Sequence, residues 1–164
     1  MNDYASRLIR VDDTGFIFQT NFSGDPRRDN YGSDARRGNI ILPDPVLARQ
    51  LIDAGFNVKM TKPREDEEED FTPSYFISIK MNFESAYPPK IYLVSGDSEP
   101  VALGEGEMTE LDRLNDERSI KNVCAVLNPY ENPKTGNKSL YVKTMYVEQD
   151  LEDDPYYERY WRRG

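Results

Sequence analysis

The chain has 164 residues, of which 37% are hydrophobic and 31% charged, and a formal net charge of −9. With no histidine and a single cysteine, Cys124, it excludes histidine-based catalysis, histidine or multi-cysteine metal sites and an internal disulfide. The apolar content suits one core, and no stretch resembles a signal peptide or a membrane span of ~20 residues, so we expect one soluble domain in a reducing compartment.

The first half predicts three strands and a helix. The strands are residues 15–22, 39–42 and 56–62. Asp44 before Pro45 predicts the start of the helix and Gly55 its end. Residues 25–38, DPRRDNYGSDARRG, form a loop between the first two strands, which we call the arginine loop. This loop stands out because the rest of the chain is acidic.

The second half predicts four strands and a short helix. The strands are residues 74–84, 90–95, 119–128 and 138–147, and the last two form a hairpin. Thr109 is the expected cap of the short helix, with Asp112 three residues on as in a capping box. The acidity is concentrated in EDEEED, residues 65–70, and in the tail.

This inventory predicts a mainly β chain. We expect an OB-fold, a five-stranded antiparallel barrel with one inserted helix and a second short helix; a jelly-roll-like sandwich is the alternative. Residues 1–14 are an N-terminal segment, 15–147 the domain and 148–164 a flexible acidic tail that ends in aromatic and basic residues.

Enzymatic activity is not expected. Cys124 lies within an apolar strand and fits a buried, inert thiol better than a nucleophile. Six consecutive acids in residues 65–70 favour a solvated turn over a metal site, which draws carboxylates from several elements. No phosphate-binding glycine motif occurs, so we predict no cofactor and no metal.

Aromatic and basic residues share the faces of the strands expected to point outward. These residues are Lys59, Phe76, Lys80, Lys90, Tyr92, Tyr141, Lys143 and Met145. Rings that stack on bases beside cations that neutralise phosphates are what single-stranded nucleic acid requires. The alternative is that these aromatic and basic residues are simply cross-strand pairs on an exposed sheet, which show the same alternation without binding nucleic acid.

The arginine loop extends this pattern. Arg27, Arg28, Arg36 and Arg37 could straddle a phosphate backbone while Tyr31 stacks on a base. In the alternative, these arginines pair locally with Asp25, Asp29 and Asp34. We therefore expect a clamp that orders on DNA rather than a strong cationic patch.

Five stretches, in order, carry a resemblance to a known family. They are NFSGDPRRDNYG (21–32), LIDAGFNVKMTKPRE (51–65), PPKIYLVS (88–95), SIKNVCAVLNPYE (119–131) and SLYVKTMYV (139–147). Together they resemble the OB-fold single-stranded DNA-binding proteins of tailed bacteriophages, and they span residues 21–147.

The resemblance implies sequence-tolerant binding of single-stranded DNA in phage replication, recombination or repair, in the host cytoplasm. It adds Lys62 and Arg64 to the candidate DNA-binding residues named above. It also implies an acidic tail that recruits replication partners, here Glu148, Asp150, Glu152, Asp153 and Asp154. The chain departs from that pattern by ending in YYERYWRRG, where Trp161 could contact DNA or a neighbouring subunit.

Two other functions stay open on the sequence alone. One is a non-enzymatic protein-interaction or virion-assembly module, and the other is a carboxylate-metal nuclease. The sequence does not distinguish a monomer from a homodimer, and it does not distinguish DNA from RNA as the ligand.

Overall fold

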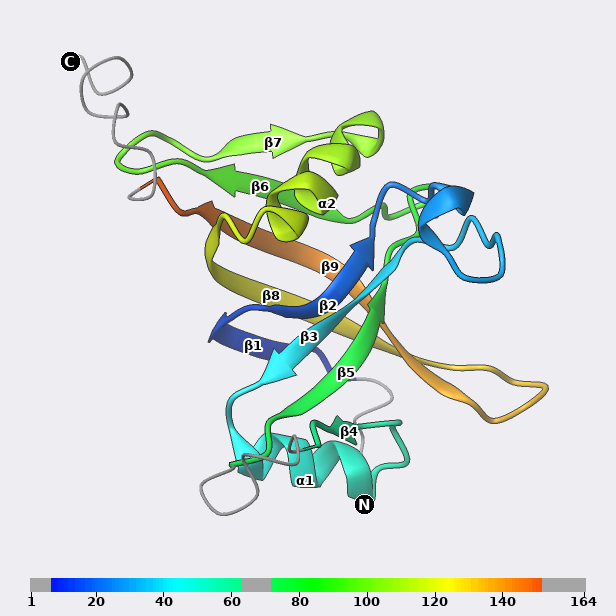
Figure 1. Cartoon of the computed structure of the whole chain (residues 1–164). Helices are drawn as coiled ribbons and strands as arrows, with labels where there is room; N and C mark the ends of the chain where they lie inside the picture. Colours follow the sequence, from blue (N-terminus) through cyan, green and yellow to red (C-terminus); the bar gives the residue numbers. More distant parts are fainter. Residues whose placement is uncertain (1–6, 63–71, 152–164) are drawn as a thin grey trace.

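The computed structural model describes residues 7–62 and 72–151 (Figure 1). Its helices are α1 (Pro45–Asp53) and α2 (Met108–Asp116). Its strands are β1 (Ile9–Thr14), β2 (Phe16–Asn21), β3 (Arg37–Leu42), β4 (Lys59–Met60), β5 (Tyr75–Lys80), β6 (Lys90–Val94), β7 (Val101–Leu103), β8 (Ile120–Glu131) and β9 (Lys138–Gln149). The prediction of a mainly β chain with two helices is confirmed.

One sheet contains all the described strands, and its main path runs β1-β8-β9-β5-β3-β2. The two ends of this path, β1 and β2, are consecutive in the chain and meet at Gly15. There the Ile41 N–H donates to the Gly15 carbonyl at 3.0 Å, and the Thr14 hydroxyl donates to the Ile41 carbonyl at 2.7 Å. These contacts bring the two ends of the path together, so the sheet is barrel-like.

The sheet is mixed rather than fully antiparallel. The first half of β9 pairs in parallel with β5, and its second half pairs in parallel with β6. β4 and β7 are short additions, on β5 and β6 respectively. The described residues thus hold nine strands, where the sequence predicted a five-stranded antiparallel barrel. The seven predicted strand segments each overlap one observed strand, and the two strands not predicted are β1, which lies in the segment expected to precede the domain, and the three-residue β7.

α1 forms as the sequence predicts. The Asp44 carboxylate accepts the Val46 N–H at 2.9 Å, Pro45 opens the helix, and Gly55 follows its end with φ of +94°. Leu51 is fully buried on the inner face of the helix. α1 thereby covers one end of the barrel, near β3 and β5, while α2 lies towards the other end, against β2 (Figure 1).

α2 begins earlier than predicted. A 3-10 turn, Glu105–Glu107, leads into Met108, and the Glu107 carboxylate accepts the Gly104 N–H at 3.0 Å. Thr109 is therefore not the cap. Neither α1 nor α2 is long or apolar enough to cross a membrane, in the part of the chain that the structure describes.

A bulge changes which side chains of β9 face outward. Val126 pairs with Thr144 and Leu127 with Val142, so Lys143 is an extra residue on β9. Beyond it the alternation reverses: Met145 is fully buried and Tyr146 is exposed. The prediction that Met145 faces outward is therefore wrong, because a one-residue insertion moves every later side chain to the other face.

Candidate nucleic-acid interface

The residues Asn21-Phe22-Ser23-Gly24 shape the start of the arginine loop. The Asn21 side chain accepts the Asp25 N–H at 2.9 Å and donates to the Asp25 carbonyl at 3.0 Å. The Phe22 side chain is fully buried in the core. Gly24 has φ of +70°, and a Cβ there would lie 2.9 Å from the Asp34 carbonyl oxygen. This motif of the family resemblance thus has a structural role, which is to fix the chain direction at the loop.

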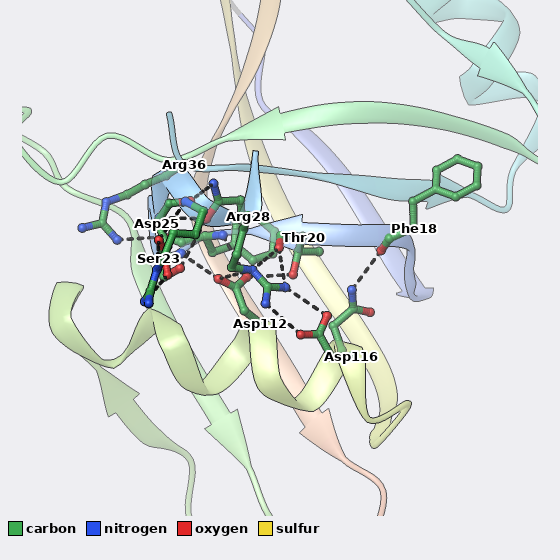
Figure 2. A network of polar contacts seen from close by, with 12 residues as sticks. Phe18, Thr20, Ser23, Asp25, Arg28, Arg36, Asp112 and Asp116 are labelled. Carbon is green, nitrogen blue, oxygen red and sulfur yellow. Dashed lines mark hydrogen bonds and ion pairs between the residues drawn. The ribbon is translucent and has the colours of Figure 1, made fainter. Parts of the chain in front are cut away.

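A buried carboxylate on α2 holds the same turn (Figure 2). Asp112, only 2% exposed, accepts hydrogen bonds from the Thr20 hydroxyl at 2.8 Å, the Phe22 N–H at 2.9 Å and the Ser23 N–H at 3.0 Å. A buried carboxylate is costly unless such donors satisfy it. The prediction that Asp112 belongs to a capping box is therefore wrong, and its role here was not predicted because its partners lie some ninety positions away in the sequence.

Arg28 belongs to this network. Its guanidinium donates to the Thr20 carbonyl at 2.8 and 3.0 Å and to both oxygens of Asp116 at 2.8 and 2.9 Å. Its Nε also lies 3.5 Å from the Asp112 carboxylate. Arg28 therefore ties the arginine loop to α2.

The other three arginines of the loop also have carboxylate partners. Arg27 pairs with Asp25 at 2.9 Å and Arg37 with Asp29 at 2.8 Å, as the local-pairing alternative predicts. Arg36 lies 3.5 Å from the Glu105 carboxylate. Arg36 also donates to the Phe22 carbonyl and lies over the Phe83 ring, 5.1 Å from its centroid. Carboxylates inside the loop and on neighbouring segments thus neutralise its four arginines. The Arg27 and Tyr31 side chains are largely exposed to solvent.

These contacts shift the pKa values in directions that keep the pairs ionised. The hydrogen bonds from Arg28 lower the pKa of Asp116, and those from Arg27 lower the pKa of Asp25. The pKa of Asp29 is lowered first by the backbone N–H groups of Ser33 and Tyr31, and then by Arg37. The pKa of Arg28 is raised, chiefly by Asp116.

A polar row crosses the outer face of four neighbouring strands. Asn128 on β8 pairs with Tyr141 on β9, Tyr141 with Lys80 on β5, and Lys80 with Arg37 on β3. Cross-strand neighbours point to the same side of a sheet. The structure thus brings together three of the predicted site residues, Tyr141, Lys80 and Arg37.

One end of this row opens into a groove of about 740 Å³ that contains three tyrosines. Tyr87 is 91% exposed, and the Tyr130 and Tyr141 rings meet edge to face with centroids 5.9 Å apart. Lys143, the bulge residue, lines the same groove. We call this the tyrosine groove. Tyr141 and Lys143 were predicted from the sequence, whereas Tyr87, which lies just before Pro88-Pro89, and Tyr130, which lies beyond the predicted end of its strand at residue 128, were not.

Next to it lies a smaller hollow of about 170 Å³, lined by Lys59, Lys80 and Lys138 from β4, β5 and β9. We call it the lysine hollow. Lys80 donates to the Ser139 hydroxyl at 3.4 Å, and Lys138 donates to the Ala54 carbonyl and lies near the Phe56 ring. None of the three forms an ion pair with a described residue. In this they differ from the four arginines of the loop, each of which has a carboxylate partner. Lys138 lies at a hairpin turn and was not predicted.

The remaining candidates lie elsewhere. Phe76 faces outward but is only 7% exposed, because Phe18 packs on it edge to face and β4 runs alongside. Tyr92 stacks on Tyr146 at 4.8 Å beyond the bulge, and Lys90 is exposed near it on β6. Lys62 is exposed at the edge of the described region.

Several predicted residues fall in the tail or in the loop before β5. Glu148 belongs to β9, and the Asp150 N–H donates to the Ser119 carbonyl at 2.7 Å. Outside the described residues lie Arg64, the acidic run 65–70, Glu152, Asp153, Asp154 and Trp161.

Neither Cys124 nor the described carboxylates form a metal cluster. Cys124 is half-buried, and its sulfur accepts the Asp13 N–H at 3.4 Å. No group of three or more cysteine, aspartate or glutamate side chains within residues 7–62 and 72–151 could hold a metal ion.

The chain matches the family model described as "Putative phage ssDNA-binding domain" over residues 3–161. It therefore belongs to this family of phage single-stranded DNA-binding domains, and the resemblance seen in the sequence motifs is confirmed. No curated protein matches its sequence.

Solved structures that are similar to the chain include two forms of one phage protein. The single-stranded DNA-binding protein from bacteriophage Enc34 aligns with a TM-score of 0.47 at 13% identity, over 87% of this chain and 81% of that one. A C-terminal truncation of the same protein aligns with a TM-score of 0.46 at 12% identity, over 87% and 86% of the two chains.

Proposed function

We propose that this phage ssDNA-binding protein is an OB-fold that binds single-stranded DNA across the outer face of β8, β9, β5 and β3. The observation that carries the proposal is that the lysine hollow adjoins the tyrosine groove. Lys80 and Tyr141 are direct cross-strand neighbours, so a cation that forms no ion pair within the described residues lies beside a ring that can stack on a base. Each nucleotide of a DNA strand likewise carries a phosphate close to a base, so the two side chains can contact both groups.

The two parts of the face have different tasks in this proposal. Tyr87, Tyr130 and Tyr141 stack on bases, which contributes about 1–3 kcal/mol per base and tolerates any sequence because every base has a π-face. Lys59, Lys80 and Lys138 contact phosphates and release counterions, so that binding weakens with salt. Both terms are non-covalent, and the proposed function needs no enzymatic step, cofactor or metal.

The arginine loop borders this face and has a shaping role in the proposal. Arg28 and Arg36 are engaged in holding the loop. Arg27 and Tyr31 are the side chains that reach into solvent and meet the DNA strand. Since Asp25 neutralises Arg27, we expect the loop to add contact and orientation rather than strong attraction.

The broader role is proposed from the family. Such a protein protects single-stranded DNA during phage replication, recombination or repair in the host cell. The tail, with Glu148 and Asp150 at its start, is a candidate contact for protein partners.

Titration with oligo-dT, followed by intrinsic tyrosine and tryptophan fluorescence, tests the proposal. We expect quenching by the wild type, about ten-fold weaker binding for Tyr141→Leu, and near wild-type binding for Tyr141→Phe, which keeps the ring. Tyr146→Leu, which removes an exposed ring outside the groove, is the control and is expected to stay within about two-fold. No quenching by the wild type even at low salt would favour the protein-interaction alternative.

A further inference from the structure

Phe18 is an exposed aromatic residue in an unusual backbone conformation. Its side chain is 63% exposed, although it lies in the middle of β2. Its φ is +64°, which lies in the left-handed region that residues other than glycine rarely adopt, bulky residues least of all. Rare conformations of this kind persist only where the surroundings hold them, and they cluster at functional sites.

Two features of the fold account for the conformation of Phe18. The pairing of β2 with β3 is irregular between Ile17 and Asn21, so the backbone of Phe18 does not have to follow the regular strand geometry. The Asn115 side chain of α2 donates to the Phe18 carbonyl at 2.9 Å. In Figure 2 the Phe18 ring points away from the polar network. The ring is thus presented outward rather than folded into the core.

The ring lies at the far end of the proposed DNA-binding face. Phe18 meets Phe76 edge to face, with centroids 5.3 Å apart and an interplanar angle of 80°. Phe76 is the cross-strand neighbour of Lys59, which lines the lysine hollow. The hollow is therefore flanked by the tyrosine groove on one side and by the Phe18 ring on the other.

We propose that Phe18 is a further base-stacking residue, which receives a base on the side of the lysine hollow opposite the tyrosine groove. The contact with Phe76 supports one edge of the ring and leaves a face open for a base. A cation that binds a phosphate between two base-stacking sites, the tyrosine groove and Phe18, matches the alternation of bases and phosphates along a DNA strand. This inference rests on the proposed single-stranded DNA binding and extends its path beyond the residues predicted from sequence.

Substitutions that separate the ring from its bulk test the inference. Phe18→Leu keeps an apolar side chain with the same backbone strain but removes the π-face, whereas Phe18→Tyr keeps the ring. Val46→Ala, at an apolar residue on α1 that is 62% exposed, is the control for loss of exposed apolar surface. Binding is measured by fluorescence anisotropy of end-labelled oligo-dT of 20 nucleotides, and thermal denaturation checks the fold of each variant.

We expect Phe18→Leu to weaken binding about ten-fold, while Phe18→Tyr and Val46→Ala stay within about two-fold of the wild type. Wild-type binding with an unchanged affinity for Phe18→Leu would overturn the role of Phe18 but leave the proposed function intact. An equal loss for Phe18→Leu and Phe18→Tyr would also overturn it, since stacking would not be the cause. A wild type that binds no oligo-dT would refute the proposed function itself.

Discussion

Replacing Asp112 by asparagine tests whether the buried carboxylate on α2 holds the arginine loop in place. The two oxygens of Asp112 accept hydrogen bonds from Thr20, Phe22 and Ser23 and face Arg28. An asparagine side chain has only one accepting oxygen. If this oxygen keeps the bonds to Thr20 and Phe22, the NH₂ group replaces the oxygen that faces the Ser23 N–H and Arg28, which are themselves donors. Each buried donor without an acceptor costs about 1–3 kcal/mol. With the Ser23 N–H and the Arg28 guanidinium affected, we expect Asp112→Asn to lower the free energy of unfolding by about 3 kcal/mol.

That loss corresponds to a fall in Tm of about 10 °C, because 1 kcal/mol shifts the Tm of a chain of this size by about 2–4 °C. Asp116→Asn is the matched control, since Asp116 pairs with the same arginine but is 39% exposed, and about 1 kcal/mol or less is expected. Thermal and urea denaturation followed by circular dichroism measure both. Equal losses for the two variants, or a loss below about 1 kcal/mol for Asp112→Asn, would refute the reasoning.

Three further predictions concern the arginine loop. Arg28→Ala should lower the Tm by several degrees, while Arg27→Ala should leave it within about 1 °C because Arg27 pairs with Asp25 in an exposed local ion pair; circular dichroism melts compare the two variants. Gly24→Ala should lower the free energy of unfolding by about 2 kcal/mol or more, and Gly32→Ala by about 1 kcal/mol, as measured by urea denaturation. Both glycines have a positive φ, but only at Gly24 would the added Cβ clash with a neighbouring atom. The pKa values of Asp25, Asp29 and Asp116 are lowered in the folded state, so these residues stabilise the fold above about pH 4, and this stabilisation is lost as the pH falls through their folded-state pKa values. Hydrogen exchange of the loop, measured at pH 7, 5 and 3, should show a loss of protection only at pH 3.

Local signals predicted much of the fold. Asp44, Pro45 and Gly55 set the ends of α1 by contacts within a few residues, and the alternation of β5 placed Lys80 on the outer face. The bulge at Lys143 has no such signal, because it depends on how β8 and β9 align over their length. The reversal of Met145 and Tyr146 could therefore not be predicted from alternation.

The candidate site was predicted in part for the same reason. Tyr141, Lys80 and Lys59 follow from strand faces, which are local properties. Asp112 and Lys138 act on residues about ninety and eighty positions away, at Thr20 and Ala54, so only the barrel-like sheet brings them to their partners. The charge of the arginine loop was visible in the sequence, but its neutralisation by Asp116 and Glu105 was not.

The salt dependence of binding tests most directly the central claim that the lysine hollow contacts the phosphates of single-stranded DNA. The slope of log Kobs against log salt concentration is measured with oligo-dT for the wild type and for the triple variant Lys59→Gln, Lys80→Gln, Lys138→Gln. Each lost phosphate contact lowers the slope by about 0.7 for single strands, so a fall in its magnitude of about 2 is predicted. A triple variant that folds normally and keeps the wild-type slope would contradict the claim.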